Sequence, residues 1–434
     1  MHTTIKTQLL LLACIITAGY ISCRKTDGFS HNPSAPITVG SFSPTQGPIG
    51  TELLIKGDNF ASDTSQVKVS INGVPLLVVG VNGNEIMAVI TEKTGTGPVV
   101  VSIDKNTGTS SGVFNYQFSY MVSTLAGSGS AGYNDGKGTG ASFNFNGVRG
   151  QLSVDQNLNV YVADGGNQRV RKIASDGTVT TIAGSGINGY LDGNASSAQF
   201  NNPCGTTVDA NGNVYVSERN GRNIRKITPD GVVSTYAHGN GNGGNELTSV
   251  VINNTTGAIY WSDFYGDGIY QLRSGSVQKV INHSLPCTIT IDGQGNIYAT
   301  HYDDQTVMKY TYNASSDTFD NGTVLAGTSH VSGMADGIGT NATFARPWGI
   351  APDSKNNLYV SGQGGGDKSN CVRLITADTW TVTTIAGVGD NTGYIDGLGG
   401  DARFNQPTGI AVDKNNDLYV LDMGNNRVRK ITVK

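Results

Sequence analysis

The side chains of this sequence that are best suited to chemistry belong to four histidines in the second half of the chain. His238, His283, His301 and His330 lie in or beside segments that have the composition of loops between short strands. An imidazole exchanges a proton near neutral pH and also binds transition metals. The spacing of the four matches no metal motif, and the chain holds no GxSxG, HExxH or P-loop segment. We therefore predict no metal site, no cofactor and no assigned catalytic residue, while acid–base work by a histidine pair stays an open alternative.

These histidines belong to a larger group of residues at which an internal repeat of the sequence loses its regularity. Aromatic rings combined with scattered polar groups provide the stacking and directional hydrogen bonds that sugar or peptide recognition needs. We call the group the divergent set and predict that it forms a ligand-binding face. Its members are His238, Asp263, Tyr265, His283, His301, Tyr302, Asp303, His330 and Trp348.

The elements that must position this set come from a motif that the chain repeats six times. The clearest copies start at Val179 and Val382, and each copy contains four short strand patterns of the types VTTIAG, GIAVD, NVYVAD and RVRKI. Four strands in each unit of about 45 to 55 residues are typical of a β-propeller blade. In a propeller, the loop that enters each inner strand and the turn between the second and third strands share one face. The divergent set is therefore expected on that face.

The phase of the repeat predicts how the propeller closes. The first copy begins with a VTTIAG-type strand that has no blade before it, and the chain ends after three strands of the last blade. Pairing of Val122–Gly127 with Arg427–Val433 would complete the sixth blade and remove two open sheet edges. We predict an all-β chain with a six-bladed propeller over residues 120–434, closed by its own N-terminal strand.

Several charged residues recur in blade after blade, and repetition favours a structural role over a ligand site. The loop aspartates are predicted to cap their own loops through backbone N–H groups. Asp164 and Asp422 are interpreted as turn residues that hold Arg169 and Arg427. The recurring Arg-Lys pairs are expected to be solvated strand surface, and a net charge of −4 offers no basis for binding nucleic acid. The loop aspartates are Asp135, Asp192, Asp336 and Asp396, and the pairs begin at Arg171, Arg225 and Arg429.

The N-terminus has the pattern of a targeting segment. An apolar stretch from Leu9 to Ile21 is too short to span a membrane comfortably and ends at Ser22-Cys23. This resembles a bacterial lipoprotein signal over residues 1–22, with Cys23 as the lipidated residue and residues 23–35 as a polar tether. An ordinary secretory signal is the alternative. The three remaining cysteines match no zinc pattern and are predicted to be buried free thiols: Cys204, Cys287 and Cys371.

Residues 36–119 break the repeat and predict a separate β-sandwich. Short alternating strands are separated by turn signals such as Gly47-Pro48 and Asn72-Gly73. The segments SFSPTQGPIGTELLIKGDNF, INGV and GPVVVSI closely resemble the IPT/TIG domain family of immunoglobulin-like folds. The resemblance implies a spacer or binding module.

The propeller segment resembles NHL repeats over nearly all of its length. The carrying motifs are FNQPTGIAVDKNNDLYVLDMGNNRVRKI and NVYVADGGNQRVRKI, whereas AIYWSDFYGDGIYQL in the third blade is more similar to a YWTD repeat. The resemblance implies a binding platform, with enzymes among a few relatives. Calcium-dependent propeller hydrolases place carboxylates at the channel mouth. The corresponding column here holds none: Gly150, Cys204, Thr248, Cys287, Trp348 and Thr408.

The function predicted from these observations is ligand binding at the cell envelope, with a lipid anchor in the outer membrane and exposure at the cell surface left open. The expected partner is an extracellular glycan or a surface protein of a glycan-uptake system, and no nucleic acid. The domain order resembles surface proteins of Bacteroidota-type bacteria. A polysaccharide lyase or hydrolase and a purely structural adhesion module are the alternatives. Convergence of His283, His301 and His330 on one pocket would favour chemistry, and dispersal would favour binding.

Overall fold

The computed structural model describes residues 30–145, 147, 149–238, 246–265, 268–363 and 369–434. The predicted signal peptide, Cys23 and most of the predicted tether lie outside these residues. Regular structure within the described residues consists of β-strands and short 3-10 helices. A search of that part of the chain for a helix long and apolar enough to cross a membrane found none. The 3-10 helices are η1 (Thr64–Gln66), η2 (Gly138–Gly140), η3 (Gly165–Asn167), η4 (Gly339–Asn341), η5 (Gly399–Asp401) and η6 (Met423–Asn425).

The chain divides into two compact units, Met1–Phe118 with Lys434, and Ser119–Val433. The first unit contains a four-stranded sheet of β1 (Thr38–Ser43), β3 (Glu52–Asp58), β7 (Glu85–Val89) and β6 (Leu77–Val81). Its second sheet has the order β2 (Gln46–Gly47), β9 (Asn106–Tyr116), β8 (Gly97–Ile103), β4 (Val67–Ile71) and β5 (Val74–Pro75). Alternate residues of these strands are buried in one apolar core, for example Leu53, Ile55, Val99 and Val101.

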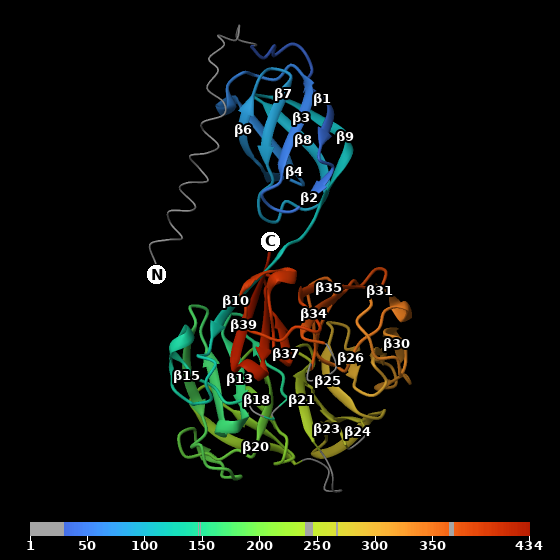
Figure 1. Ribbon diagram of the computed structural model, residues 1–434. Coiled ribbons are helices and arrows are strands. Elements are labelled where there is room, and N and C mark those ends of the chain that lie inside the picture. Colours follow the sequence, from blue (N-terminus) through green and yellow to red (C-terminus); the bar gives the residue numbers. More distant parts are fainter. Residues whose placement is uncertain (1–29, 146, 148, 239–245, 266–267, 364–368) are drawn as a thin grey trace. The chain divides into compact units, whose positions relative to one another are not determined.

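The second unit is propeller-like and contains six sheets of four or five strands in its described residues (Figure 1). From the inner strand outward, sheet one comprises β12 (Ser153–Val154), β13 (Val160–Asp164), β14 (Arg169–Ile173), β15 (Thr178–Ala183) and β11 (Gly136–Lys137). Sheet two comprises β17 (Pro203–Val208), β18 (Val214–Glu218), β19 (Asn223–Ile227), β20 (Val232–His238) and β16 (Gly193–Asn194). Sheet three comprises β21 (Leu247–Ile252), β22 (Ile259–Asp263), β23 (Gly268–Arg273) and β24 (Ser276–Asn282).

Sheets four to six follow the same order. Sheet four comprises β25 (Pro286–Ile291), β26 (Ile297–His301), β27 (Thr306–Tyr310) and β30 (Thr323–Ala326), with the hairpin β28 (Tyr312–Asn313) and β29 (Thr318–Phe319) inserted before β30. Sheet five comprises β32 (Pro347–Pro352), β33 (Leu358–Gly362), β34 (Cys371–Ile375), β35 (Thr381–Gly387) and β31 (Gly337–Ile338). Sheet six comprises β37 (Pro407–Val412), β38 (Leu418–Asp422), β39 (Arg427–Val433), β10 (Tyr120–Ala126) and β36 (Gly397–Leu398).

Strand β10 joins the sheet formed by the end of the chain. It pairs antiparallel with β39, with Tyr120 opposite Val433 and Val122 opposite Ile431. The inner strands of neighbouring sheets contact one another in sequence, and β37 contacts β12. Hydroxyl groups link neighbouring sheets: Thr288 Oγ1 of β25 donates to the Trp348 carbonyl of β32 over 2.5 Å, and Ser361 Oγ of β33 donates to the Thr408 carbonyl of β37 over 2.6 Å. The strand ends that carry the loops are thus held by hydrogen bonds between sheets.

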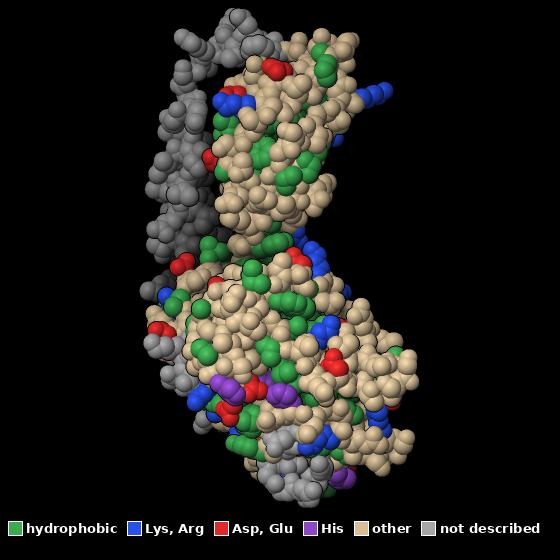
Figure 2. Space-filling model, turned by 90° about the vertical axis from the view of Figure 1, so that its right-hand side faces the viewer, with side chains coloured by type: hydrophobic (Ala, Val, Ile, Leu, Met, Phe, Trp, Pro, Cys, Tyr) green, Lys and Arg blue, Asp and Glu red, His purple; other side chains and the backbone are tan. Residues whose placement is uncertain are grey.

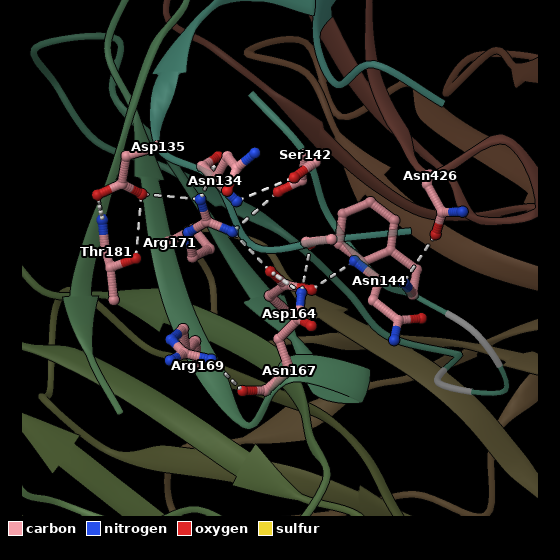
Figure 3. A network of polar contacts seen from close by, with 12 residues as sticks. Asn134, Asp135, Ser142, Asn144, Asp164, Asn167, Arg169, Arg171, Thr181 and Asn426 are labelled. Atoms are coloured by element: carbon pink, nitrogen blue, oxygen red, sulfur yellow. Dashed lines mark hydrogen bonds and ion pairs between the residues drawn. The ribbon is translucent and has the colours of Figure 1, made fainter. Parts of the chain in front are cut away.

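A buried arginine between two carboxylates stabilises sheet one, as Figure 3 shows. Arg171 is fully buried, and its Nη1 donates to Asp164 Oδ2 over 2.7 Å while its Nη2 donates to Asp135 Oδ1 over 2.8 Å. Asp135 also accepts from the backbone N–H of Thr181 over 3.0 Å. Asp135 therefore binds the third and fourth strands. The prediction that it caps its own loop was wrong, because its hydrogen-bond partners in the described residues are Arg171 and Thr181.

The same arrangement, which we call the acid–arginine–acid triad, recurs in sheets two and six. Arg225 lies between Glu218 and Asp192, and Arg429 between Asp422 and Asp396. Two further predictions were wrong. The Arg-Lys pairs were expected to be solvated, but the arginine of each pair is buried. The turn acids Asp164 and Asp422 were expected to hold Arg169 and Arg427, but they bind Arg171 and Arg429. The arginines point into the sheet stack because a guanidinium can satisfy two carboxylates and several carbonyls at once.

The free cysteines are buried as predicted. Cys204, Cys287 and Cys371 are unpaired and lie in the interior of the second unit. Burial raises the pKa of the Cys204 and Cys371 thiols to about 12, so neither thiol is a reactive nucleophile at neutral pH.

Candidate functional site

The divergent set includes both buried and exposed side chains. Asp263, His301 and Trp348 are each 1% exposed, at the ends of β22 and β26 and in β32. Tyr265 is 57% exposed, and the side chain of His330 is 72% exposed. The buried members therefore shape the face from below, whereas Tyr265 and His330 can meet a ligand directly.

Three of the four histidines converge on one aspartate. The rings of His283 and His301 lie 4.0 Å apart between centroids. Asp304 places one carboxylate oxygen 3.8 Å from His283 Nε2 and the other 3.6 Å from His330 Nε2. His238 has a different partner, since its Nδ1 lies 3.1 Å from Asn223 Oδ1. Histidine and acidic side chains are neighbours on the surface in Figure 2.

His301 is a poor candidate for a general acid. Burial, together with the neighbouring His283, lowers the pKa of His301 to about 3, so its ring is neutral at physiological pH. Its Nε2 lies 3.0 Å from the Tyr310 hydroxyl. His283 and His330 lie 3.6–3.8 Å from Asp304, beyond hydrogen-bond distance, and His301, the ring beside His283, cannot supply a proton near neutral pH.

Two aromatic members of the set, the buried Trp348 and the partly buried Tyr302, pack with the buried Phe264 in a cluster. Phe264 lies 5.7 Å from Trp348, and Tyr302 lies 5.9 Å from Trp348, between ring centroids. Trp348 was expected at the mouth of an inner strand, where a sugar could stack on it. Its near-complete burial makes it a support for neighbouring residues, and Tyr265, which meets Phe264 edge-on at 5.0 Å, is the ring that stays exposed.

A polar cavity that was not predicted from the sequence lies next to this cluster, because two of its lining arginines contact Trp348 and Tyr302. It has a volume of about 700 Å³, and the described residues that line it include no carboxylate. Arg149 places its guanidinium 5.3 Å from the Trp348 ring centroid, and Arg346 lies 4.9 Å above Tyr302. The side chains of the predicted set thus position two arginines that were not predicted. The lining residues are Ala131, Asn144, Gly147, Arg149, Arg219, Arg346, Gln363, Gln406, Met423, Gly424 and Asn426.

The arginines of the cavity are held in defined orientations. When the Gln363 amide is turned so that its oxygen faces Arg149, it accepts from Nε over 2.6 Å and from Nη2 over 2.8 Å. Arg219 donates to Glu246 and to the Gly147 carbonyl. Cation–π contact and these bonds fix the guanidinium planes, which lowers the entropy cost of binding an anion.

A signal for these arginines exists in the aligned repeats. Arg149 stands where four other repeats carry proline, and Arg346 stands where the last repeat carries Gln406. Arg219 directly follows the acid of its turn, where the third repeat has Phe264. The column of repeat positions considered above begins at Gly150, one residue after Arg149. The departure of Arg149 from the repeat was therefore missed.

Comparison with known proteins agrees with the two-part composition. The IPT/TIG domain model matches residues 36–120, and the Teneurin NHL domain model matches residues 188–432. The second match covers more than half of the chain, and the protein belongs to the Teneurin NHL domain family.

Individual relatives are distant. Human NHL repeat-containing protein 2 is 23% identical, with 64% of this chain and 46% of that protein covered. The chain thus spans about half the length of the curated relatives it matches. A Bacteroides thetaiotaomicron protein of unknown function superposes with a TM-score of 0.64 at 22% identity, covering 93% of this chain and 100% of that one. An auxiliary nutrient binding protein from Bacteroides ovatus gives 0.58 at 22% identity and the same coverage, and at such identity the likeness concerns the fold.

Proposed function

We propose that this member of the Teneurin NHL domain family is a lipid-anchored cell-envelope protein that binds an extracellular acidic glycan in its arginine-lined cavity. In this proposal residues 1–22 are a signal peptide, Cys23 carries the lipid, and residues 23–35 are a tether. Residues 36–119 form the IPT/TIG domain, and residues 120–434 form a six-bladed propeller closed by β10. The pairing of β10 with β39 and the contacts among the inner strands support the closure.

The cavity is the observation that carries the proposal. Its volume of about 700 Å³ lies within the range of small-ligand sites. Guanidinium groups pair with carboxylate or sulfate oxygens in a bidentate way, which neutral sugars cannot reproduce. The amides of Gln363, Gln406 and Asn426 add donors and acceptors for hydroxyl groups. A saccharide that carries an acidic group fits this combination better than a neutral one.

The likeness to an auxiliary nutrient binding protein of Bacteroides ovatus supports a role in nutrient uptake. In that setting the lipid anchor keeps the propeller at the envelope, and the exposed Tyr265 extends the recognition surface beyond the cavity. A surface protein of the same uptake system is the alternative partner, and it would contact the exposed rim more than the cavity.

A binding screen tests the proposal. Residues 24–434 are applied to a glycan array holding matched neutral, uronate-containing and sulfated saccharides, and hits are quantified by calorimetry. We expect saturable binding of acidic saccharides, weakened about 10-fold or more in Arg149→Ala because a charged hydrogen-bond donor is lost. Arg169→Ala, which removes an arginine outside the cavity, serves as the matched control.

Each result of the screen separates the alternatives. Equal binding of neutral and acidic saccharides would contradict the role of the arginines. Loss of arrayed glycan after binding would indicate a lyase or hydrolase. Silence on the array, with capture of a surface protein, would move the function to protein recognition.

A further inference from the structure

His283, His301 and His330 share one hydrogen-bond arrangement, in which each Nδ1 lies near a backbone carbonyl oxygen. The Nδ1 atoms of His283 and His301 lie 3.2 Å and 3.1 Å from the Ser284 carbonyl oxygen. The Nδ1 of His330 lies 3.3 Å from the Asp303 carbonyl oxygen. A carbonyl only accepts, so each Nδ1 carries a hydrogen and each neutral ring presents Nε2 as a lone-pair donor. This is how metal-binding histidines are oriented by their surroundings.

The fourth group of the cluster is the Asp304 carboxylate. One ligand atom from each of His283, His301 and Asp304 lies within 4.8 Å of the others. The Asp304 oxygens are 3.8 Å from His283 Nε2 and 3.6 Å from His330 Nε2, which is too long for hydrogen bonds. Ligands around a tetrahedral zinc ion are about 3.3 Å apart, so atoms of this group that lie up to 4.8 Å apart must approach by up to about 1.5 Å when a metal ion binds.

Comparison with the other sheets shows that the cluster is not the repeated scaffold. Where sheet one has Asp164 and Arg171, sheet four has His301 and Met308 at the same register positions. Met308 thus stands in place of the buried guanidinium, and His301 lies next to His283 with 4.0 Å between the ring centroids. The backbone N–H of His330 donates to the Asp304 carbonyl over 2.9 Å, which fixes the loop that supplies the last histidine.

We propose that His283, His301, Asp304 and His330 form a site for a divalent transition-metal ion, with Zn²⁺ the best match. Imidazole nitrogens with one carboxylate suit zinc, and three histidines disfavour Ca²⁺ and Mg²⁺, which prefer oxygen ligands. The Tyr310 hydroxyl, which bonds His301 Nε2 over 3.0 Å, must release that nitrogen when the metal binds. Met308 Sδ, 3.7 Å from the same hydroxyl, offers it an alternative contact.

The test is calorimetric titration of residues 24–434 with ZnCl₂, together with visible absorption after addition of Co²⁺. We expect one ion for each chain and Co²⁺ bands of a four-coordinate site. His283→Ala and Asp304→Asn should each weaken zinc binding about 10-fold or more. Tyr310→Phe should strengthen it about 5-fold, because a competing hydrogen bond of about 1 kcal/mol is removed.

His238→Ala is the matched control, since it removes a propeller histidine bonded to Asn223 outside the cluster. Melting temperatures of all variants without metal show whether a loss reflects unfolding. Equal weakening by His238→Ala, no effect of His283→Ala or Asp304→Asn in folded protein, or weaker binding in Tyr310→Phe would each overturn the site. Glycan binding is read separately in metal-free protein, so the two proposals can fail independently.

Discussion

Sheets one and four of the propeller-like unit are built from the same strand pattern but use their equivalent positions differently. In sheet one, a buried arginine binds two acids that come from different connections. In sheet four, Met308 stands at the register position of that arginine, and the position of the turn acid is taken by His301, whose Nε2 is bonded to the Tyr310 hydroxyl. The comparison indicates that the repeated polar residues form an interior scaffold, whereas the groups of the proposed metal site stand where the repeat is lost.

The energetic difference between the two sheets follows from burial. A buried arginine is costly unless its donors are satisfied. Arg171 meets this condition at both Nη atoms, which also donate to the carbonyls of Ser142 and Asn134, whereas its buried Nε has no hydrogen-bond partner. Removing either side of such a pair leaves a charge in the interior. Sheet four has the uncharged Met308 at this position, so its loop residues can change without leaving a buried charge unpaired.

The largest expected effect comes from removing the strand that closes sheet six. Deletion of residues 428–434 eliminates most of β39, including the fully buried Val428, Arg429 and Ile431. It removes the strand that lies between β10 and β38, so β10 stays paired only with the two-residue β36 and β38 only with β37. We expect loss of the cooperative thermal transition of the second unit in calorimetry. An unchanged melting temperature would contradict closure by β10, and deletion of Lys434 alone is the control.

A smaller but still large loss of stability should follow when Arg171 of sheet one is replaced by methionine, the residue at the equivalent position of sheet four. Arg171→Met leaves Asp164 buried without its cation, which we expect to cost about 3–5 kcal/mol in the free energy of unfolding, measured by urea denaturation. Arg169→Met, two residues earlier and partly exposed, should cost less than about 1 kcal/mol. Similar costs for both variants would show that the triad is not what distinguishes the sheets.

The sequence allowed the architecture to be predicted far better than the site. The short alternating patterns of each repeat predict where the strands form. The position of Val122–Gly127 in the repeat predicted that this segment pairs with Arg427–Val433, and β10 does pair with β39. The roles of the arginines were missed because Arg169 and Arg171 are two residues apart and share one face of the strand. The sequence pattern therefore predicts the same exposure for both. Their exposures differ because only Arg171 points between two acids that lie 29 residues apart in sequence.

The site could be predicted only as a set of unusual positions. All four histidines were expected on one face over blades three to five. His283, His301 and His330 lie near one another, whereas His238 contacts Asn223, and the divergent set contained Asp303 but not Asp304. A side chain in a short turn can face either way, and the backbone of the Tyr302–Gln305 turn decides that Asp304 meets the histidines. The cavity arginines were missed because a single residue at a strand mouth carries no periodic signal.

The smallest expected effect compares the same hydroxyl in two sheets. Thr124 Oγ1 of β10 donates to Asp396 over 3.1 Å, and Thr181 Oγ1 of β15 donates to Asp135 over 3.0 Å. Thr→Val at either position removes one partly exposed hydrogen bond and keeps the shape, so each variant should lose about 0.5–1.5 kcal/mol in urea denaturation. The sheets differ in one respect: Thr124 comes from the start of the unit, whereas Thr181 belongs to the same repeat as its partners. If Thr124→Val costs about as much as Thr181→Val, sheet six is held as firmly as a sheet made from continuous chain. A neutral Thr124→Val beside a costly Thr181→Val would mean that the triad of sheet six does not fasten β10, and that backbone pairing alone joins the two ends of the unit.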